Sequence, residues 1–376
     1  MSIVVKPLNQ TRSELKKYVD FGINLYTDSP YYVPPLRMDE VNTLLPKENP
    51  AFDYCKAQSF MAYRDGEPVG RITAIINSVT NQRTGRKQMR FGFVDFIDDT
   101  EVTDALFQAA ESWGRGQGMT EVVGPMGFTD MDHEGMLIEG FEEMGTMATI
   151  YNYPYYATHM ERLGYVKDAD WIEFRVEIPD GVPDKFQRIA SLVQRKYGLK
   201  TLRFTSRRKL RDAYGHALFE LINDAYDNLY GYCPLSERQI NYYIKQYLGF
   251  LRLDCVSVIV DAEDKLVAVG ISMPSMSEAL RASKGKLFPF GWIPLLKAIK
   301  GKNDVVDLLL IAVHKDYLGK GVNALIFADL IPTFIKNGYK FAESNIELED
   351  NDSVQQQWDY YNHRQHRRRR AWKKSL

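Results

Sequence analysis

The feature that most constrains the fold is an apolar run that leads through a glycine-containing turn into an amphipathic helix. The run is LLLIAV at residues 308–313, and it is followed by HKDYLGKGVNALIFADLIPTFIKNG. Leu325, Leu330 and Phe334 recur at spacings that place them on one face of a helix. We therefore predict a buried strand, a tight turn and a core-facing helix that extends to about residue 338.

The turn itself has the composition of an anion-binding loop. Gly319 and Gly321 allow the backbone to turn so that successive N–H groups and the first turn of the helix converge on one point. Lys320 adds a positive charge between them. A GxG sequence between a strand and a helix is also common as a plain connection, so the neighbouring elements must decide between the two interpretations.

The elements on both sides of the turn can be read from the sequence. Residues 256–273, VSVIVDAEDKLVAVGISM, predict two strands around an Asp-Lys turn. Residues 339–347 predict a further strand, followed by a helix from about Ser353. The order is therefore hairpin, strand, glycine turn, helix, strand and helix.

This stretch resembles motif A of the GCN5-related N-acetyltransferase (GNAT) superfamily, whose members bind acyl-CoA at that turn. The resemblance implies a thiolate acid near Asn351, where counting seven residues gives Trp358 in place of the usual Tyr, with Tyr360 close behind. Leu318 stands where the family has a cation or amide, and Asn323 where it has a small residue. The residues that the resemblance assigns to acyl-CoA are Val313, Leu318, Gly319, Lys320, Gly321, Val322, Asn323 and Asn351.

Length and composition indicate two globular domains. A chain of 376 residues, with 45% apolar and 26% charged residues, can bury two cores. Its three cysteines are widely spaced, which predicts neither a disulfide framework nor a metal site. The start MSIVVKPLNQ lacks the apolar region of a signal peptide. We expect a cytoplasmic protein, soluble or peripheral at the inner membrane face.

The N-terminal half repeats the order of elements of the C-terminal half. We predict an α+β fold of two tandem GNAT-like domains, 1–178 and 185–376, each a mixed, mostly antiparallel sheet flanked by helices. At the position of the glycine turn the first half has Ile97, Asp98, Asp99 and Thr100. Because these carboxylates repel a pyrophosphate, we place acyl-CoA on the C-terminal half only.

A long loop in the N-terminal half carries candidate catalytic groups. Asp132, His133 and Glu134 alternate acid, base and acid, and a polar aromatic run that includes Tyr156 follows. A histidine flanked by carboxylates has its charged form favoured, which suits a proton acceptor near neutral pH. A solvated acidic turn followed by packed tyrosines is the alternative for each residue taken alone.

A second resemblance covers most of the chain. Its motifs are GPMGF, MLIEGFE, YNYPYY and ERLGY, together with SPYYVPPLRMDE and NPAF near residues 29–52. These motifs resemble the bacterial ceramide-synthase-like proteins, which are tandem acyltransferase folds related to GNATs. The resemblance implies N-acylation of a long-chain sphingoid base by a fatty acyl-CoA.

Two segments suggest contact with a membrane. Residues 284–302 combine aromatic and aliphatic side chains with five lysines, as interfacial segments do. Residues 364–374 include RRRR at 367–370. The alternatives are a surface helix packed on its own sheet, and a charged final strand whose side chains contact acids of the same fold. Nucleic acid is a less favoured partner because the chain as a whole is near neutral.

We therefore predict an acyl-CoA-dependent N-acyltransferase acting on a small-molecule or lipid amine, without a metal. The candidate bases are His133, Glu134 and Asp307, and the candidate thiolate acids are Tyr156 and Tyr360. A backbone N–H of the cofactor strand is expected to stabilise the oxyanion. The alternatives are a small-amine N-acetyltransferase and a catalytically inactive tandem GNAT-like module that binds a ligand or regulates a partner.

Overall fold

The computed structural model describes residues 2–376, and its internal contacts divide the protein into two compact units. Unit 1 takes the chain as far as Ile172, together with Ser277–Leu295 and His366–Leu376. Unit 2 takes Glu173–Met276 and Leu296–Gln365. The predicted domains 1–178 and 185–376 are each continuous in sequence, whereas these units combine separated segments.

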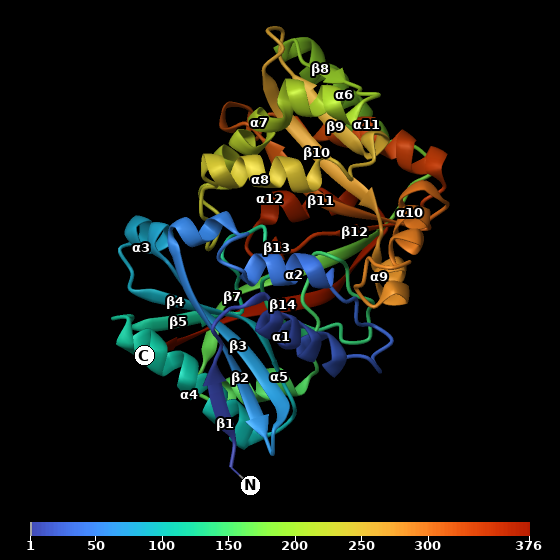
Figure 1. The fold of residues 1–376 in the computed structure, drawn as a ribbon. Coiled ribbons are helices and arrows are strands. Elements are labelled where there is room, and N and C mark those ends of the chain that lie inside the picture. The colour runs from blue at the N-terminus through green and yellow to red at the C-terminus, as the bar shows by residue number, and fades with distance from the viewer. Residues whose placement is uncertain (1) are drawn as a thin grey trace. The chain divides into compact units, whose positions relative to one another are not determined.

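Unit 1 is built on a mixed sheet (Figure 1). Its strand order is β1-β2-β3-β4-β5-β14, with β4 and β5 parallel and the other neighbours that belong to this unit antiparallel. The strands are β1 (Val4–Pro7), β2 (Cys55–Arg64), β3 (Glu67–Asn77), β4 (Gln88–Phe96), β5 (Glu121–Gly124), β6 (Met136–Glu139) and β14 (His363–Ser375). The helices are α1 (Arg12–Leu25), α2 (Arg37–Leu44), α3 (Ser78–Thr84), α4 (Thr100–Gly116), α5 (Tyr155–Arg162) and α9 (Ser277–Ser283).

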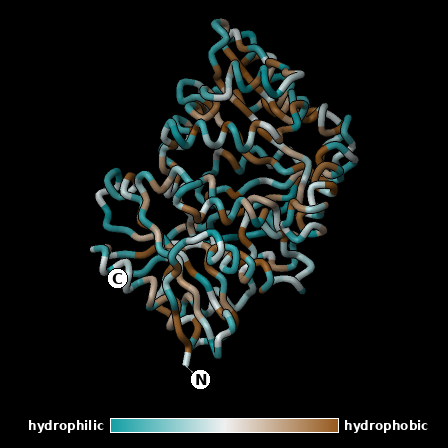
Figure 2. The backbone as a smooth tube through the Cα atoms, viewed as in Figure 1, coloured by the Kyte–Doolittle hydropathy of each residue, from teal (hydrophilic) through white to brown (hydrophobic). Residues whose placement is uncertain are grey.

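Alternate residues of the unit 1 strands enter two separate cores. On β3, Ile72, Ala74 and Ile76 belong to the core that also contains Leu106 of α4. Ile75 belongs to the other core, with residues of α1 and α2. Both faces of this sheet are therefore covered by helices, as the two-residue period of a strand requires. Figure 2 shows hydrophobic residues along these strands and hydrophilic ones at the turns.

Unit 2 has a sheet of the same kind. Its order is β8-β9-β10-β11-β12-β7, in which only β11 and β12 are parallel. The strands are β7 (Val166–Glu177), which belongs to unit 2 from Glu173 onward, β8 (Lys200–Leu202), β9 (Val256–Val260), β10 (Leu266–Pro274), β11 (Val305–Val313), β12 (Phe341–Ser344) and β13 (Glu347–Leu348). The helices are α6 (Asp184–Tyr197), α7 (Arg207–Tyr226), α8 (Glu237–Tyr247), α10 (Trp292–Lys300), which belongs to unit 2 from Leu296 onward, α11 (Asn323–Asn337) and α12 (Asp352–Gln355).

The two units share one plan, which confirms the predicted α+β class. In each, an antiparallel hairpin leads to a strand, a helix and a second strand parallel to the first: β4-α4-β5 in unit 1 and β11-α11-β12 in unit 2. The helix predicted from about Ser353 is shorter than expected. It ends at Gln355, and a 3₁₀ turn, η4 (Trp358–Tyr360), follows it.

The basic residues of β14 are used inside unit 1. Arg367 and Arg369 are each 1% exposed and donate to the carbonyls of Met144 and Ile150. Other pairs are Arg370 with Asp170 at 2.7 Å, Lys373 with Asp168 at 2.8 Å and Lys374 with Glu111 at 2.8 Å. These cations pair with groups of their own fold, which favours the alternative of a charged final strand over the predicted membrane contact through 364–374.

Candidate functional site

Two glycines in left-handed conformations shape the turn between β11 and α11. Gly319 has a φ of 70° and Gly321 a φ of 79°. A β-carbon at Gly319 would meet nothing within 4 Å, whereas one at Gly321 would lie 2.8 Å from Ile189 Cγ2 on α6. Gly319 therefore faces open space, and Gly321 lets the turn pack closely on α6.

The N–H groups of this turn are available to a ligand. Val322 precedes α11 and provides no side-chain cap. Within residues 2–376, no hydrogen bond uses the backbone N–H of Gly319, Gly321, Val322 or Asn323. Unpaired donors at the start of a 15-residue helix favour a negatively charged group.

The side chains around the turn differ in their roles. Lys320 Nζ lies over the rings of Tyr197 and Tyr317, at 5.2 and 5.3 Å from their centres. Leu318 is 59% exposed. Because its side chain is apolar, it offers no hydrogen bond to a ligand at the turn. Asn323 Nδ2 donates to Gln357 Oε1 at 3.3 Å, which ties the start of α11 to the segment before η4.

Strands β11 and β12 separate beside this turn. Their parallel pairing ends at Leu308 and Ser344, and Asn345 Nδ2 then donates to the carbonyl of Leu309 at 3.0 Å. His314 N donates to Val267 of β10, so alternation along the strand turns the N–H groups of Ile311 and Val313 toward the opened side. No strand of the described chain pairs with β11 there.

A carboxyl that the sequence analysis missed lies just after this opening. Glu347, on β13, accepts hydrogen bonds from Trp358 Nε1. Burial raises the pKa of Glu347 to about 7, and the bond from Trp358 partly opposes that shift. Asp307, the candidate on the cofactor strand, is 3% exposed and lies opposite Met273 and Glu343 within the paired part of β11. The signal for Glu347 is an acid at the end of the predicted strand 339–347, together with Trp358 at the position where the GNAT resemblance has Tyr.

Tyr360 belongs to the same part of unit 2. It is 43% exposed, and its hydroxyl contacts Lys185 Nζ, which also lies over its ring. Trp358 packs on Phe327 of α11 with ring centres 6.0 Å apart, so η4 lies against the helix that begins at the glycine turn. Asn351 precedes α12 and forms no side-chain cap there.

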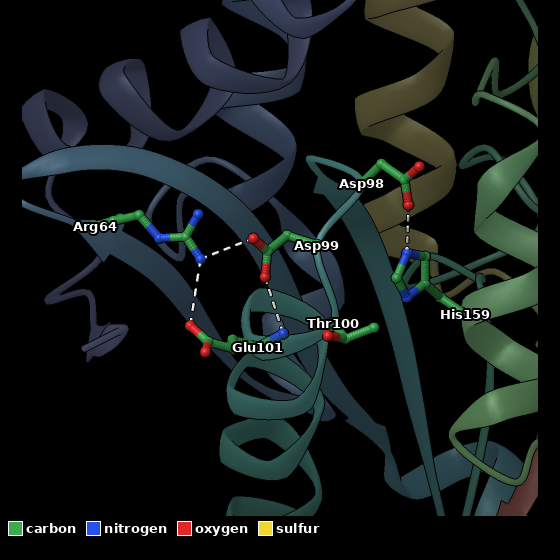
Figure 3. A pocket seen from close by; sticks show the side chains of 6 residues that line it. All are labelled: Arg64, Asp98, Asp99, Thr100, Glu101 and His159. Atoms are coloured by element: carbon green, nitrogen blue, oxygen red, sulfur yellow. Dashed lines mark hydrogen bonds and ion pairs between the residues drawn. The ribbon is translucent and has the colours of Figure 1, made fainter. Parts of the chain in front are cut away.

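The corresponding turn of unit 1 is acidic. Arg64, Asp98, Asp99, Thr100, Glu101 and His159 line an open pocket there (Figure 3). Asp99 caps α4 by accepting from Glu101 N at 2.9 Å, and it pairs with Arg64 at 2.8 Å. Asp98 lies 2.8 Å from His159 Nε2. In unit 1, a side-chain carboxylate accepts from the backbone N–H groups at the start of α4. The corresponding N–H groups at the glycine turn of unit 2 remain available to a ligand.

His133 and Glu134 lie in unit 1, and burial decides their ionisation. Burial lowers the pKa of His133, whose Nε2 lies 3.0 Å from the Met147 carbonyl. Burial, followed by the charge of Asp130, raises the pKa of Glu134 well above its ordinary value. The expectation that flanking carboxylates favour a charged His133 is therefore wrong: desolvation outweighs attraction, and the neutral imidazole is favoured.

Tyr156 is part of a buried polar network in unit 1 that the sequence analysis did not identify. Its hydroxyl lies 2.6 Å from Tyr26 Oη and accepts from Phe96 N at 3.0 Å. Tyr26 donates to Asp95 at 2.7 Å, and Asp95 pairs with Arg71 at 2.6 Å. The Tyr156 hydroxyl is therefore enclosed and satisfied, while Tyr360 is the more accessible phenol.

Comparison with known proteins places the chain in a family. No family model matches it. It is 33% identical over 300 residues to the bacterial ceramide synthase of Caulobacter vibrioides, covering 78% of this chain and 76% of that protein. It is 29% identical over 371 residues to Protein YghO of Escherichia coli K12, covering 97% of this chain and 94% of that protein.

Solved structures show the same fold at low sequence identity. A tandem GNAT protein from the clavulanic acid biosynthesis pathway matches with a TM-score of 0.58 at 15% identity, covering 100% of this chain and 98% of that chain. A GCN5-related N-acetyltransferase from Sphaerobacter thermophilus matches with a TM-score of 0.53 at 9% identity, covering 99% of this chain and 95% of that chain. The protein thus has the tandem GNAT fold, and it belongs to the family of the bacterial ceramide synthase.

Proposed function

We propose that the protein is an acyl-CoA-dependent N-acyltransferase whose thioester substrate binds to unit 2. The observation that carries this proposal is the row of free N–H groups at Gly319, Gly321, Val322 and Asn323, beside the separated edges of β11 and β12. The pyrophosphate is held at the turn, with Lys320 as a nearby cation. The open side of β11, with the N–H groups of Ile311 and Val313, holds the amide-containing arm and the thioester.

The residues of unit 2 also supply the proton transfers of an aminolysis. The attacking amine must lose a proton, and Glu347, with a pKa of about 7, accepts it near neutral pH. A backbone N–H of β11 stabilises the oxyanion, and Tyr360 beside Lys185 protonates the departing thiolate. His133 and Glu134 of unit 1, and Asp307 of β11, are tested as competing bases.

For the acceptor we propose a long-chain lipid amine of the sphingoid-base class. Support comes from the relative named as a bacterial ceramide synthase, since a ceramide is an N-acylated sphingoid base. The acyl donor is accordingly a long-chain acyl-CoA. An acetyl-CoA-dependent enzyme acting on a small amine is the competing function, and titration with both thioesters separates the two.

The binding proposal is tested by calorimetric titration with palmitoyl-CoA, acetyl-CoA and free CoA. Aspartate and asparagine both tolerate the left-handed conformation at position 319, and a side chain there meets open space. Gly319→Asp therefore adds a charge, whereas Gly319→Asn adds the same shape without one. We expect Gly319→Asp to weaken binding by about tenfold or more and Gly319→Asn to change it only about threefold.

Gly338, at the other end of α11, is the matched control position because its φ is 77°. Gly338→Asp should leave acyl-CoA affinity unchanged. Equal affinities of the Asp and Asn variants at 319 would contradict binding at this turn. If the wild-type protein binds none of the three ligands, the inactive-module alternative is favoured instead.

The acceptor is tested by measuring amide formation from palmitoyl-CoA with a long-chain sphingoid base and, in parallel, with short primary amines. Product from the long-chain base alone supports the lipid assignment. Product only from acetyl-CoA and a short amine would replace it with small-amine acetylation.

A further inference from the structure

Residues 284–302 form a segment with unusually exposed large apolar side chains. Phe288 is 75% exposed, Phe290 71%, Trp292 44% and Leu296 42%. Leu296 lies one turn after Trp292 on α10, so both occupy one side of that helix. Leu295, which lies about 100° around the helix from Leu296, is 7% exposed and anchors the helix. Brown segments mark this apolar stretch near α10 (Figure 2).

The same segment is strongly and uniformly basic. Residues 279–303 contain no Asp or Glu, although the whole chain has 49 acidic against 48 basic residues. The basic residues of this stretch are Arg281, Lys284, Lys286, Lys297, Lys300 and Lys302. Within the described part of the chain, residues 2–376, none of these five lysines forms an ion pair. Their charge is therefore available to an external partner.

The exposed aromatic rings are held on an ordered loop. Arg37 donates from its backbone N to the carbonyl of Gly285 at 2.9 Å and from Nε to that of Lys284 at 3.1 Å. Trp292 N donates to Leu287 O at 3.0 Å, which closes the loop that contains Phe288 and Phe290. Gly285 has a φ of 69°, and a β-carbon there would lie 2.1 Å from the carbonyl oxygen of Pro35. The loop thus presents its rings outward without paying the entropy of ordering them.

We propose that residues 284–302, the basic aromatic segment, dock on the surface of an anionic phospholipid bilayer. Exposed Phe and Trp rings insert at the boundary between headgroups and acyl chains, and unpaired lysines are attracted to anionic headgroups. Helix α10 has nine residues, so the segment lies on the membrane. Among the residues that the structure describes, no helix is long and apolar enough to cross one.

The charge of the segment argues against self-association as the explanation for the exposed rings. In a symmetric contact the same lysines of two copies would face each other, and like charges oppose such a contact. An anionic surface removes this repulsion and also accepts the apolar rings. The proposal goes beyond the proposed acyl transfer, because docking requires neither acyl-CoA nor an amine.

The test is co-sedimentation of the full chain with vesicles of phosphatidylcholine alone or mixed with phosphatidylglycerol, without acyl-CoA. We expect binding to the anionic vesicles that weakens with added NaCl, and at least tenfold weaker binding to phosphatidylcholine. Phe288→Ser/Phe290→Ser should lose at least tenfold in affinity. Phe250→Ser is the matched control, because Phe250 is 65% exposed outside the segment.

The charge contribution is tested with a second pair of variants. Lys284→Gln/Lys286→Gln should weaken binding about fivefold for each lysine removed. Lys16→Gln/Lys17→Gln, two exposed lysines of α1, should leave it unchanged. Vesicles containing brominated lipids should quench part of the tryptophan emission of the wild-type protein, and Trp292→Phe should remove that part.

Three outcomes would overturn the proposal: no binding of the wild-type chain to anionic vesicles at low salt, equal binding by Phe288→Ser/Phe290→Ser, or a wild-type dimer in sedimentation velocity that this variant abolishes while vesicle binding is absent. The test is separable from that of acyl transfer. Gly319→Asp should lose acyl-CoA binding and keep vesicle binding. Phe288→Ser/Phe290→Ser should lose vesicle binding and keep acetyl-CoA binding.

Discussion

The indole Nε1 of Trp358 lies 3.1 and 3.2 Å from the two carboxylate oxygens of Glu347. Trp358 is 4% exposed and is fixed against Phe327 of α11. Trp358 occupies the position at which the GNAT resemblance has a Tyr that protonates the thiolate. An indole cannot protonate a thiolate, but it can donate a hydrogen bond to Glu347. It holds and tunes a carboxyl whose pKa burial raises to about 7.

We predict that Glu347 is responsible for the pH dependence of acyl transfer. The rate should rise with pH through an inflection near 7, because only the ionised carboxylate accepts a proton. Glu347→Gln should lower kcat by about 10² or more and remove the inflection. The measurement is a pH–rate profile at saturating substrates.

Trp358→Phe provides a finer test of the same assignment. The bond from Trp358 lowers the pKa of Glu347, so its loss should move the inflection to higher pH while leaving the base in place. Asp350→Asn, at an exposed neighbouring acid, is the control. An unchanged profile in Glu347→Gln, with a changed profile in His133→Gln or Asp307→Asn, would assign the base elsewhere.

Glu347 should also make the stability of the protein depend on pH. Its pKa is about 7 when folded and 4.5 in its ordinary state, so between these values the folded protein keeps a proton that the unfolded chain loses. The stabilisation is complete below pH 4.5 and is lost as pH rises to 7. The free energy of unfolding of Glu347→Gln, measured in urea, should gain up to about 3 kcal/mol relative to wild type across this window. A constant difference between the two proteins would contradict the shift.

Removing Arg71 should destabilise the protein strongly. Arg71 is 6% exposed and lies 2.6 Å from Asp95 and 2.7 Å from Glu40. Arg71→Met leaves two buried carboxyls without their cation, which costs about 3–5 kcal/mol. Arg64→Met is the control, because Arg64 and Asp99 are partly exposed and solvent-screened pairs of this kind contribute little to stability. Urea unfolding should separate the two variants clearly, and similar losses would contradict this ranking.

One acyl-CoA should bind per chain. Asp98 and Asp99 of unit 1 occupy the position at which unit 2 has free N–H groups, and Asp99 itself accepts from the start of α4. Calorimetry should therefore give a stoichiometry of one, and the single Gly319→Asp change should weaken all of the binding. A second, unaffected site in that variant would show that unit 1 also binds the thioester.

Local features of the fold could be predicted because they depend on residues close in sequence. Asp65 and Gly66, a turn pair that favours a tight hairpin, join β2 to β3, and both residues have positive φ angles, 53° and 88°. The turn before α11 follows in the same way from Gly319 and Gly321. The early end of α12 was not predicted, because it depends on the burial of the Trp358 side chain by residues distant in sequence and not on helical propensity.

The sequence by itself determined the order of elements, the mixed sheet of each unit and the glycine turn, since backbone conformation and hydrophobic period are local properties. Only the tertiary structure decided which charges are satisfied. It buried Arg367 and Arg369 within unit 1, left Lys284 and Lys286 unpaired in the described chain, and desolvated His133 and Glu347. The physical reason is that desolvation and ion pairing depend on which groups distant segments bring together, and the spacing of charges along the chain does not specify those neighbours.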